Sequence, residues 1–272
     1  MTIKEALRVG SIELQNGKEA RILLSHHLQK DELQLILIEN EEVPSLDKYF
    51  SLIARAKEGE PIEYITNAVS FYSREFFIKK GALIPRPETE LLIDKVIQEA
   101  SKFKSPHIAE IGVGSGIISC LLALLIEDVT ITATDISQEA IDIAKVNAVR
   151  FGVEDKITFI HTPYLIDVNE KFDIIVSNPP YIAEDASLEK NLSYEPDIAL
   201  FGGKIGDEIL KNIIDIALYH DNCHLCCEMG YDQKEPLIVY LESKGAHKAN
   251  FYQDIAGFDR GFTLQIGDNH RK

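Results

Sequence analysis

The second half of the chain alternates between short apolar stretches and longer stretches whose apolar residues recur at helical spacing. From His107 onward, HIAEIGV, VTITATD, ITFIHT, FDIIVSN and HLCCEMG are typical of buried strands. Between or after them, SGIISCLLALLIE, SQEAIDIAKVNAVRFG, DEILKNIIDIALYH and QKEPLIVYLESKG have the apolar spacing of helices. Strands that alternate with helices form a parallel sheet that is covered on both faces. We therefore predict an α/β fold for this part of the chain.

The last two apolar stretches break this alternation. HKANFYQDIAG and RGFTLQIGD are predicted to be two strands joined by a short turn, so this closing pair should be antiparallel. Such an ending is unlike a dehydrogenase. It is similar to the class I methyltransferase variant of the Rossmann-like fold, with a mostly parallel sheet and an antiparallel last strand.

The first part of the chain has a different character. Helical spacing of apolar residues predicts several short helices up to about Arg55, and Gly59 and Pro61 end the last of them. Aromatic and β-branched residues then increase around a polar break, which predicts a β-hairpin. We therefore predict a small N-terminal α-helical domain (1–58), a hairpin linker (59–84) and the α/β domain (85–272).

Charge and composition narrow the class of partner. The chain has 28 Lys and Arg against 44 Asp and Glu, and most of the excess acid lies after residue 80. Proteins that follow nucleic-acid backbones need basic surfaces, so the acidity argues against nucleic acid partners. Apolar runs are too short to cross a bilayer, and the first ten residues do not resemble a signal peptide, so no membrane partner and a cytoplasmic location are expected. The four cysteines are expected to be buried reduced thiols, with no metal site.

A glycine-rich turn follows the first strand of the α/β domain. Gly112, Gly114 and Gly116 have the spacing G-x-G-x-G, which permits a tight turn and a close approach of backbone to a ligand. Glu110 ends the preceding strand, and Asp135 ends the next one, where a carboxylate would accept hydrogen bonds from ribose hydroxyls.

The same turn distinguishes between two cofactors. The dinucleotide fingerprint needs a further glycine where Ile117 stands, to place a pyrophosphate at the helix N-terminus. S-adenosylmethionine has no phosphate and carries cationic groups, which an acidic strand end such as Glu110 suits better. The predicted cofactor is therefore S-adenosylmethionine.

The stretch IIVSNPPYIAE places an amide, two prolines and an aromatic residue at the end of a buried strand. Pro179 and Pro180 stiffen the loop at the sheet edge where ligands bind in open α/β folds. The Asn178 side chain and the Pro179 carbonyl offer two acceptors for one NH2 group, and Tyr181 offers a flat wall. This constellation predicts methyl transfer to a planar nitrogen, and no strong general base is evident.

Several motifs together resemble those of the protein-(glutamine-N5) methyltransferases that act on peptide chain release factors. LIPRPETE at Leu83 and SNPPYI at Ser177 are the most specific, and GEPIEYI, YEPDIALFGGKIG, CEMG and DIAGFDRG also match. The resemblance implies methyl transfer to the glutamine of the Gly-Gly-Gln motif in class 1 release factors, which would be the protein partners. It implies that the N-terminal helical domain holds the release factor and that residues 85–272 form the S-adenosylmethionine-dependent domain.

The resemblance also assigns site residues. Catalytic roles fall to Asn178, Pro179 and Tyr181, and substrate binding to Asn178, Pro179, Pro180 and Tyr181. Cofactor binding falls to Glu110, Gly112, Val113, Gly114, Ser115, Gly116, Asp135, Ile136, Tyr164 and Asn178. The family usually has Asp at position 110 and Thr at position 113. It also has an acidic residue where this chain has Thr162-Pro163, so adenine is expected to depend on backbone groups or Tyr164.

Two other hypotheses fit part of the pattern. A nucleic-acid amino-methyltransferase would use the same loop to hold an exocyclic amine of a flipped adenine or guanine, although the acidity argues against it. A non-catalytic cofactor-binding scaffold is the other, and the intact Asn178 and Tyr181 argue against that.

Overall fold

The computed structural model describes residues 1–267 and forms two compact units. The helical unit comprises residues 1–68, 78–80 and 188–194, and the sheet unit comprises residues 69–77, 81–187 and those from 195 onward. The last five residues of the predicted α/β domain, 268–272, including the end of its last predicted strand, lie outside the described residues.

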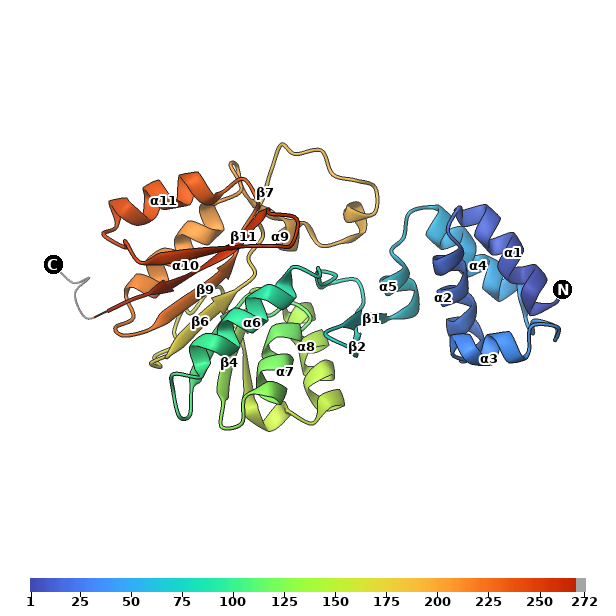
Figure 1. Ribbon diagram of the computed structural model, residues 1–272, viewed down its shortest axis with the longest axis horizontal. Helices are drawn as coiled ribbons and strands as arrows, with labels where there is room; N and C mark the ends of the chain where they lie inside the picture. Colours follow the sequence, from blue (N-terminus) through green and yellow to red (C-terminus); the bar gives the residue numbers. More distant parts are fainter. Residues whose placement is uncertain (268–272) are drawn as a thin grey trace. The chain divides into compact units, whose positions relative to one another are not determined.

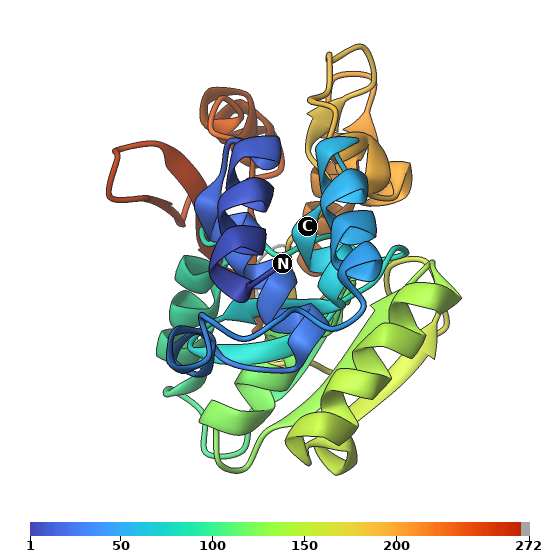
Figure 2. The ribbon, with the colours of Figure 1, turned by 90° about the vertical axis from the view of Figure 1, so that its right-hand side faces the viewer.

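Five helices form most of the helical unit: α1 (Ile3–Leu14), α2 (Gly17–Leu28), α3 (Glu32–Leu37), α4 (Leu46–Lys57) and α5 (Ile62–Thr66). The helices α1, α2 and α4 contact one another, and Figure 2 shows them in dark to light blue. Thr2 and Glu5 form a capping box that begins α1, and Asn16 accepts two backbone N–H bonds that begin α2. Tyr49 is fully buried between these helices, where its hydroxyl donates to the Ala20 carbonyl at 3.2 Å.

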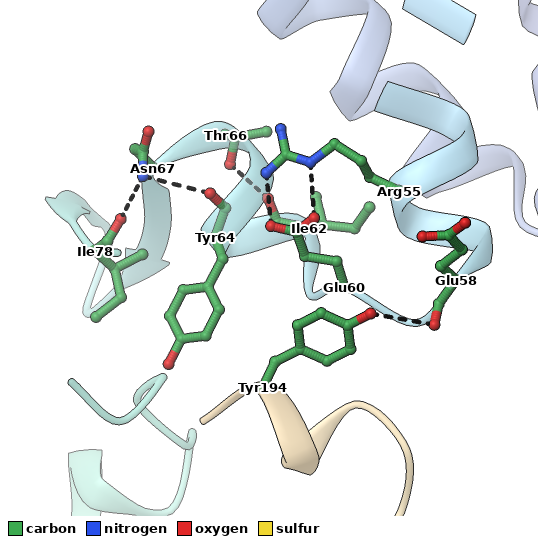
Figure 3. A network of polar contacts seen from close by, with 9 residues as sticks. All are labelled: Arg55, Glu58, Glu60, Ile62, Tyr64, Thr66, Asn67, Ile78 and Tyr194. Atoms are coloured by element: carbon green, nitrogen blue, oxygen red, sulfur yellow. Dashed lines mark hydrogen bonds and ion pairs between the residues drawn. The ribbon is translucent and has the colours of Figure 1, made fainter. Parts of the chain in front are cut away.

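A polar network closes the turn after α4 (Figure 3). The Arg55 guanidinium donates to both carboxylate oxygens of Glu60, at 2.7 and 2.6 Å. The Tyr194 hydroxyl donates to the Glu58 carbonyl at 3.3 Å, and the Asn67 amide donates to the Ile78 carbonyl at 3.2 Å. Segments that are distant in sequence are therefore fastened to the end of this helical bundle.

A short hairpin of β1 (Ala68–Phe71) and β2 (Arg74–Phe77) follows α5. Tyr72 and Ser73 both have positive φ, as the tight two-residue hairpin turn requires. Asn147 holds the end of β2 to the sheet unit, because its amide accepts from the Phe77 N–H and donates to the Phe77 carbonyl, each at 2.8 Å. Phe76 packs on Phe151 with ring centroids 4.6 Å apart.

Seven strands form the central sheet, in the order β10-β11-β9-β6-β3-β4-β5. Their bounds are β3 (His107–Ile111), β4 (Thr130–Asp135), β5 (Ile157–His161), β6 (Ile174–Ser177), β9 (His224–Glu228), β10 (Ala249–Gln253) and β11 (Asp259–Gln265). Neighbouring strands from β5 to β9 pair in parallel, whereas β11 is antiparallel to both β9 and β10. The predicted fold class, a mostly parallel sheet with an antiparallel last strand, is confirmed.

Helices cover both faces of this sheet (Figure 1). One face is covered by α6 (Thr89–Ala100), α7 (Ile117–Leu125) and α8 (Gln138–Phe151), and the other by α10 (Glu208–Leu218) and α11 (Lys234–Ser243). Ile175, Leu225, Leu210 and Leu237 belong to the buried cluster on the second face. The smaller elements are η1 (Glu154–Lys156), β7 (Ile182–Ala183), η2 (Leu192–Tyr194), α9 (Asp197–Leu200) and β8 (Phe201–Gly203).

Candidate active site

A cavity of about 230 Å³ lies in the sheet unit, at the carboxyl ends of β3, β4 and β6. This is the edge where ligands bind in open α/β sheets. Its lining includes Glu110, Gly112–Ser115, Asp135–Ser137, Pro163, Tyr164, Asn178 and Pro180, together with Gly81–Leu83, Pro85, Thr89, Ile198, Ala199 and Ile209. The structure therefore brings together the glycine turn, both acidic strand ends and the loop after β6.

The glycine turn is shaped by backbone conformation. Gly112, Gly114 and Gly116 have φ values of 78°, 52° and 79°, in the left-handed region that favours glycine. The N–H groups of Gly112 and Val113 both donate to the Thr134 carbonyl at 2.9 Å, which ties the turn to β4. Gly116 does not line the cavity. A Cβ there would lie 2.8 Å from the Ala144 Cβ, so this glycine permits the close packing of α7 on α8.

Asp135 joins the glycine turn to the start of α8. Its carboxylate accepts the Gly114 N–H at 2.9 Å on one oxygen and the Ser137 N–H at 2.8 Å on the other. Burial raises the pKa of this carboxyl, and the backbone hydrogen bonds oppose the rise. A carboxylate oxygen has more than one lone pair, so both oxygens keep acceptor capacity at the cavity wall.

Glu110 is a buried acid near the end of β3, just before the glycine turn. Its carboxylate accepts the Ser119 N–H at 3.0 Å and a short hydrogen bond from the Ser119 hydroxyl. Burial raises the pKa of Glu110 to about 8. Among the described residues, no ion pair reaches Glu110. A buried acid that lines a cavity without a cationic partner fits a positively charged ligand, because an adjacent cation favours the ionised form.

Asn178 is oriented by a chain of buried hydrogen bonds. Its side-chain Nδ2 donates to the Thr89 Oγ1 at 3.1 Å, and the Thr89 hydroxyl donates to the Glu228 Oε2 at 2.8 Å. Thr89 begins α6 and Glu228 ends β9, so three separate elements meet at this point. The Asn178 Oδ1 takes part in none of these bonds, and Asn178 lines the cavity. Its oxygen is therefore available as an acceptor.

Two family models match the chain. The PrmC N-terminal domain matches residues 5–66, and the methyltransferase small domain matches residues 87–194. A release factor glutamine methyltransferase from Clostridium acetobutylicum is 34% identical over 96% of this chain and 97% of its own length.

The chain belongs to the release factor glutamine methyltransferase family.

Other relatives are longer. A bifunctional methyltransferase from Rickettsia typhi is 37% identical over 89% of this chain, and this chain spans about half of it, 52%. Among solved structures, the N-terminal domain of human METTL16 in complex with SAH has a TM-score of 0.54 and 19% identity, covering 85% of this chain and 86% of that one. That likeness concerns the fold alone. Family membership confirms the resemblance seen in the sequence.

The loop after β6 is held in place by glutamine and glycine residues in this family member. The Gln233 amide donates to the Tyr181 carbonyl at 3.3 Å and to the Gly206 carbonyl at 2.9 Å. A Cβ at Gly202 would lie 2.5 Å from the Pro180 carbonyl oxygen, so only glycine fits there. Pro180 lines the cavity, whereas Pro179 and Tyr181 do not. Burial raises the pKa of Tyr181 to about 12, so its hydroxyl stays protonated at physiological pH.

The far end of the cavity is largely apolar. Ile136, Pro163, Ile198 and Ile209 line it together with Tyr164, whose hydroxyl accepts from the Asn212 amide at 3.1 Å. The Thr162 hydroxyl donates instead to the Ile166 carbonyl at 3.2 Å, and Thr162 does not line the cavity. Pro163 and Tyr164 therefore occupy the wall next to the position where the family usually has an acid.

The sequence did not assign roles to several residues that the structure places at the site. Thr89 lines the cavity, and Glu228 lies behind it. The buried Glu195 accepts the Ile84 N–H at 2.9 Å and forms an ion pair with Arg86, which fastens the segment before α6. The motifs could have indicated these residues, because LIPRPETE, YEPD and CEMG each carry charged residues in apolar surroundings.

Within residues 1–267, no group of three or more His, Cys, Asp or Glu side chains is arranged to hold a metal ion. Cys120, Cys223, Cys226 and Cys227 are all buried free thiols. None of the helices in this range has both the length and the apolarity that a membrane crossing would require.

Proposed function

We propose that this chain transfers a methyl group from S-adenosylmethionine to the side-chain amide nitrogen (N5) of the glutamine in the Gly-Gly-Gln motif of class 1 peptide chain release factors. The observation that carries the proposal is the orientation of Asn178. Its Nδ2 donates to Thr89, so its Oδ1 is left as an acceptor at the wall of a methyltransferase cavity. The near full-length similarity to the Clostridium enzyme supports the choice of acceptor.

The chain's own residues supply the cofactor site in this proposal. Gly112–Ser115 provide backbone groups, Asp135 holds the ribose hydroxyls, and Ile136 and Tyr164 enclose the adenine. Glu110 faces the cationic end, where burial without an ion pair suits a positive charge. When bound, S-adenosylmethionine supplies an activated methyl group on a sulfonium centre.

The substrate amide is held by two acceptors. The Asn178 Oδ1 and the Pro179 carbonyl accept its two N–H bonds, which draws electron density onto nitrogen and fixes the direction of its lone pair. The ring of Tyr181 supports the flat face of the amide, and Pro179 and Pro180 keep the acceptors rigid. Positioning of this kind contributes roughly 7–11 kcal/mol in favourable cases. The proton of the methylated amide leaves late, to water or through Asn178, without a dedicated general base.

The helical unit holds the release factor in this proposal. Its sequence between residues 5 and 66 matches the PrmC N-terminal domain. Residues 1–58 would form this recognition domain, 59–84 the linker and 85–272 the catalytic domain. Release factors act in translation, so the proposed place of the reaction is the cytoplasm.

Transfer of label from methyl-labelled S-adenosylmethionine tests the proposed acceptor. The purified chain is incubated with a class 1 release factor, with the same factor carrying alanine in place of the Gly-Gly-Gln glutamine, and with RNA or DNA. We expect label only on the release factor that keeps the Gly-Gly-Gln glutamine. Label on nucleic acid instead would support the amino-methyltransferase hypothesis. Cofactor binding without transfer to any acceptor would support the scaffold hypothesis.

A further inference from the structure

We infer that Thr89 and Glu228 are positioning residues that keep the Asn178 amide turned with its oxygen toward the acceptor nitrogen. The inference rests on the proposed function and adds the origin of the correct amide orientation. Thr89 and Glu228 are 3% and 2% exposed, so water does not compete for their hydrogen bonds. The hydrogen bonds from Asn178 to Thr89 and from Thr89 to Glu228 can each run in one direction only, and Glu228 sets that direction.

The direction follows from the number of donors and acceptors in each group. An ionised carboxylate only accepts, so the Thr89 hydroxyl must donate its single hydrogen to Glu228, over 2.8 Å. Only lone pairs are then left on the Thr89 oxygen, which must accept from its other neighbour. Asn178 meets this need with Nδ2, at 3.1 Å, and its Oδ1 is left for the substrate. An Asn178 amide flipped by 180° would place two acceptors against each other.

Protonation of Glu228 removes this constraint. A carboxylic acid can donate to the Thr89 oxygen, and the Thr89 hydrogen is then free to turn toward Asn178. The flipped amide becomes compatible with Thr89, and it would present an NH2 group to the NH2 group of the substrate. Such an arrangement binds the acceptor poorly and does not direct its lone pair.

The charges around Glu228 make this titration relevant near neutrality. The pKa of Glu228 is raised to about 7, chiefly by burial and in smaller part by the nearby Glu88. Arg260 and Arg86 oppose the rise, as does the hydrogen bond from Thr89. The phenols of Tyr181 and Tyr252 also face Glu228, and burial raises the pKa of both, so they remain neutral.

Substitutions at Thr89 test the positioning role. Thr89→Val removes the hydroxyl with little change in shape, whereas Thr89→Ser keeps it. We expect Thr89→Val to lower kcat for release factor methylation by about 10²-fold, the order seen when a catalytic group is misplaced by an ångström. The affinity for S-adenosylhomocysteine, measured by calorimetry, should stay within a few-fold. Thr89→Ser should keep kcat near the wild-type value. The matched control is Thr263→Val, at a buried threonine of β11 that does not line the cavity, and it should leave kcat unchanged.

The pH profile of kcat tests the role of Glu228. The wild type should lose activity as pH falls from 8 to 6, because Glu228 becomes protonated. Glu228→Gln keeps an oxygen acceptor for Thr89 and does not titrate, so its kcat should be independent of pH in this range. Cofactor affinity is measured in parallel, because Glu110 also titrates there and should affect binding of the cofactor.

The outcomes separate this inference from the proposed function. A wild-type enzyme that leaves the release factor unmethylated contradicts the proposed function. A wild type that methylates the factor, together with an unchanged kcat in Thr89→Val, overturns the positioning role. Identical pH profiles for wild type and Glu228→Gln overturn it as well.

Discussion

At the scale of single residues, the direction of each hydrogen bond matters more than its presence. Asn178 has a donor and an acceptor in one amide, and only one orientation serves a substrate NH2 group. The structure shows which end is taken, because Nδ2 donates to Thr89. The hydrogen bonds of Asp135 also have a fixed direction. Each of its carboxylate oxygens accepts one backbone N–H and keeps a lone pair for a ligand.

Asn178→Ala should separate binding from turnover. The side chain lies at the cavity wall, while the glycine turn and Asp135 are held by their own backbone bonds. We expect the affinity for S-adenosylhomocysteine to be retained and kcat to fall by about 10²-fold or more, because positioning of the amide is lost. Calorimetry and the methyl-transfer assay measure the two effects. Asn250→Ala, an exposed residue of β10, is the control, and an equal loss of cofactor binding in Asn178→Ala would contradict the assigned role.

At the scale of elements, the site depends on how closely helices approach one another behind it. The turn after β3 leads into α7, and α7 packs on α8 at Gly116. Asn147 of α8 also donates to the Ser115 carbonyl at 2.8 Å, so α8 holds the glycine turn from behind. Ligand contact and helix packing are therefore separate requirements on neighbouring glycines.

Gly116→Ala should destabilise the protein more than Gly152→Ala. Both glycines have positive φ, which costs an L-residue roughly 1–2 kcal/mol. A Cβ at Gly152 meets nothing within 4 Å, whereas one at Gly116 meets Ala144 backbone and side chain at 2.9 and 2.8 Å. Overpacking then adds about 1–3 kcal/mol for Gly116→Ala. Urea unfolding measures the difference, and equal losses in the two variants would show that α7 and α8 separate at no cost.

At the scale of the whole molecule, acidity is distributed between surface and interior. The chain has a formal net charge of −16, and two of its acids, Glu110 and Glu228, are buried at the active site. Both have a raised pKa because burial disfavours their ionised form. Their titration therefore affects global stability as well as the site.

The free energy of unfolding should decrease as pH rises through the range in which these acids ionise. The folded protein keeps protons on Glu228 and Glu110 up to pH of about 7 and 8, whereas the unfolded chain releases them near the ordinary glutamate pKa of 4.5. The folded state binds more protons between these values, so stability is greatest below the range and falls across it, by on the order of a few kcal/mol.

Urea unfolding of the cofactor-free protein between pH 6.5 and 8.5 measures this decrease. The range avoids most of the opposite effect of His26, His220 and His224, whose pKa values are lowered by burial. Glu228→Gln should show a flatter dependence than wild type. A wild-type stability that rises with pH over this range would contradict the raised pKa values of these two buried acids.

The sequence by itself determined the elements and their chemistry. Periodicity predicted the strands of the central sheet and the helices α7, α8, α10 and α11, but not the short elements β7, α9 and β8. The glycine turn and the N-P-P-Y loop indicated the ligand edge. These signals are local, because helical and strand spacing and turn residues depend on neighbours a few positions away. The family resemblance added the acceptor, which local patterns alone left open between a glutamine and a nucleic acid amine.

Only the tertiary structure decided which polar residues meet. Asn178 and Thr89 are 89 positions apart, and Thr89 and Glu228 are 139 apart, so no local pattern connects them. Their meeting depends on the strand order, which places β9 beside β6, and on α6 beginning at that edge. The packing role of Gly116 and the attachment of residues 188–194 to the helical unit are decided in the same way. Burial, which gives Glu110 and Glu228 their raised pKa values, is likewise a property of the folded chain.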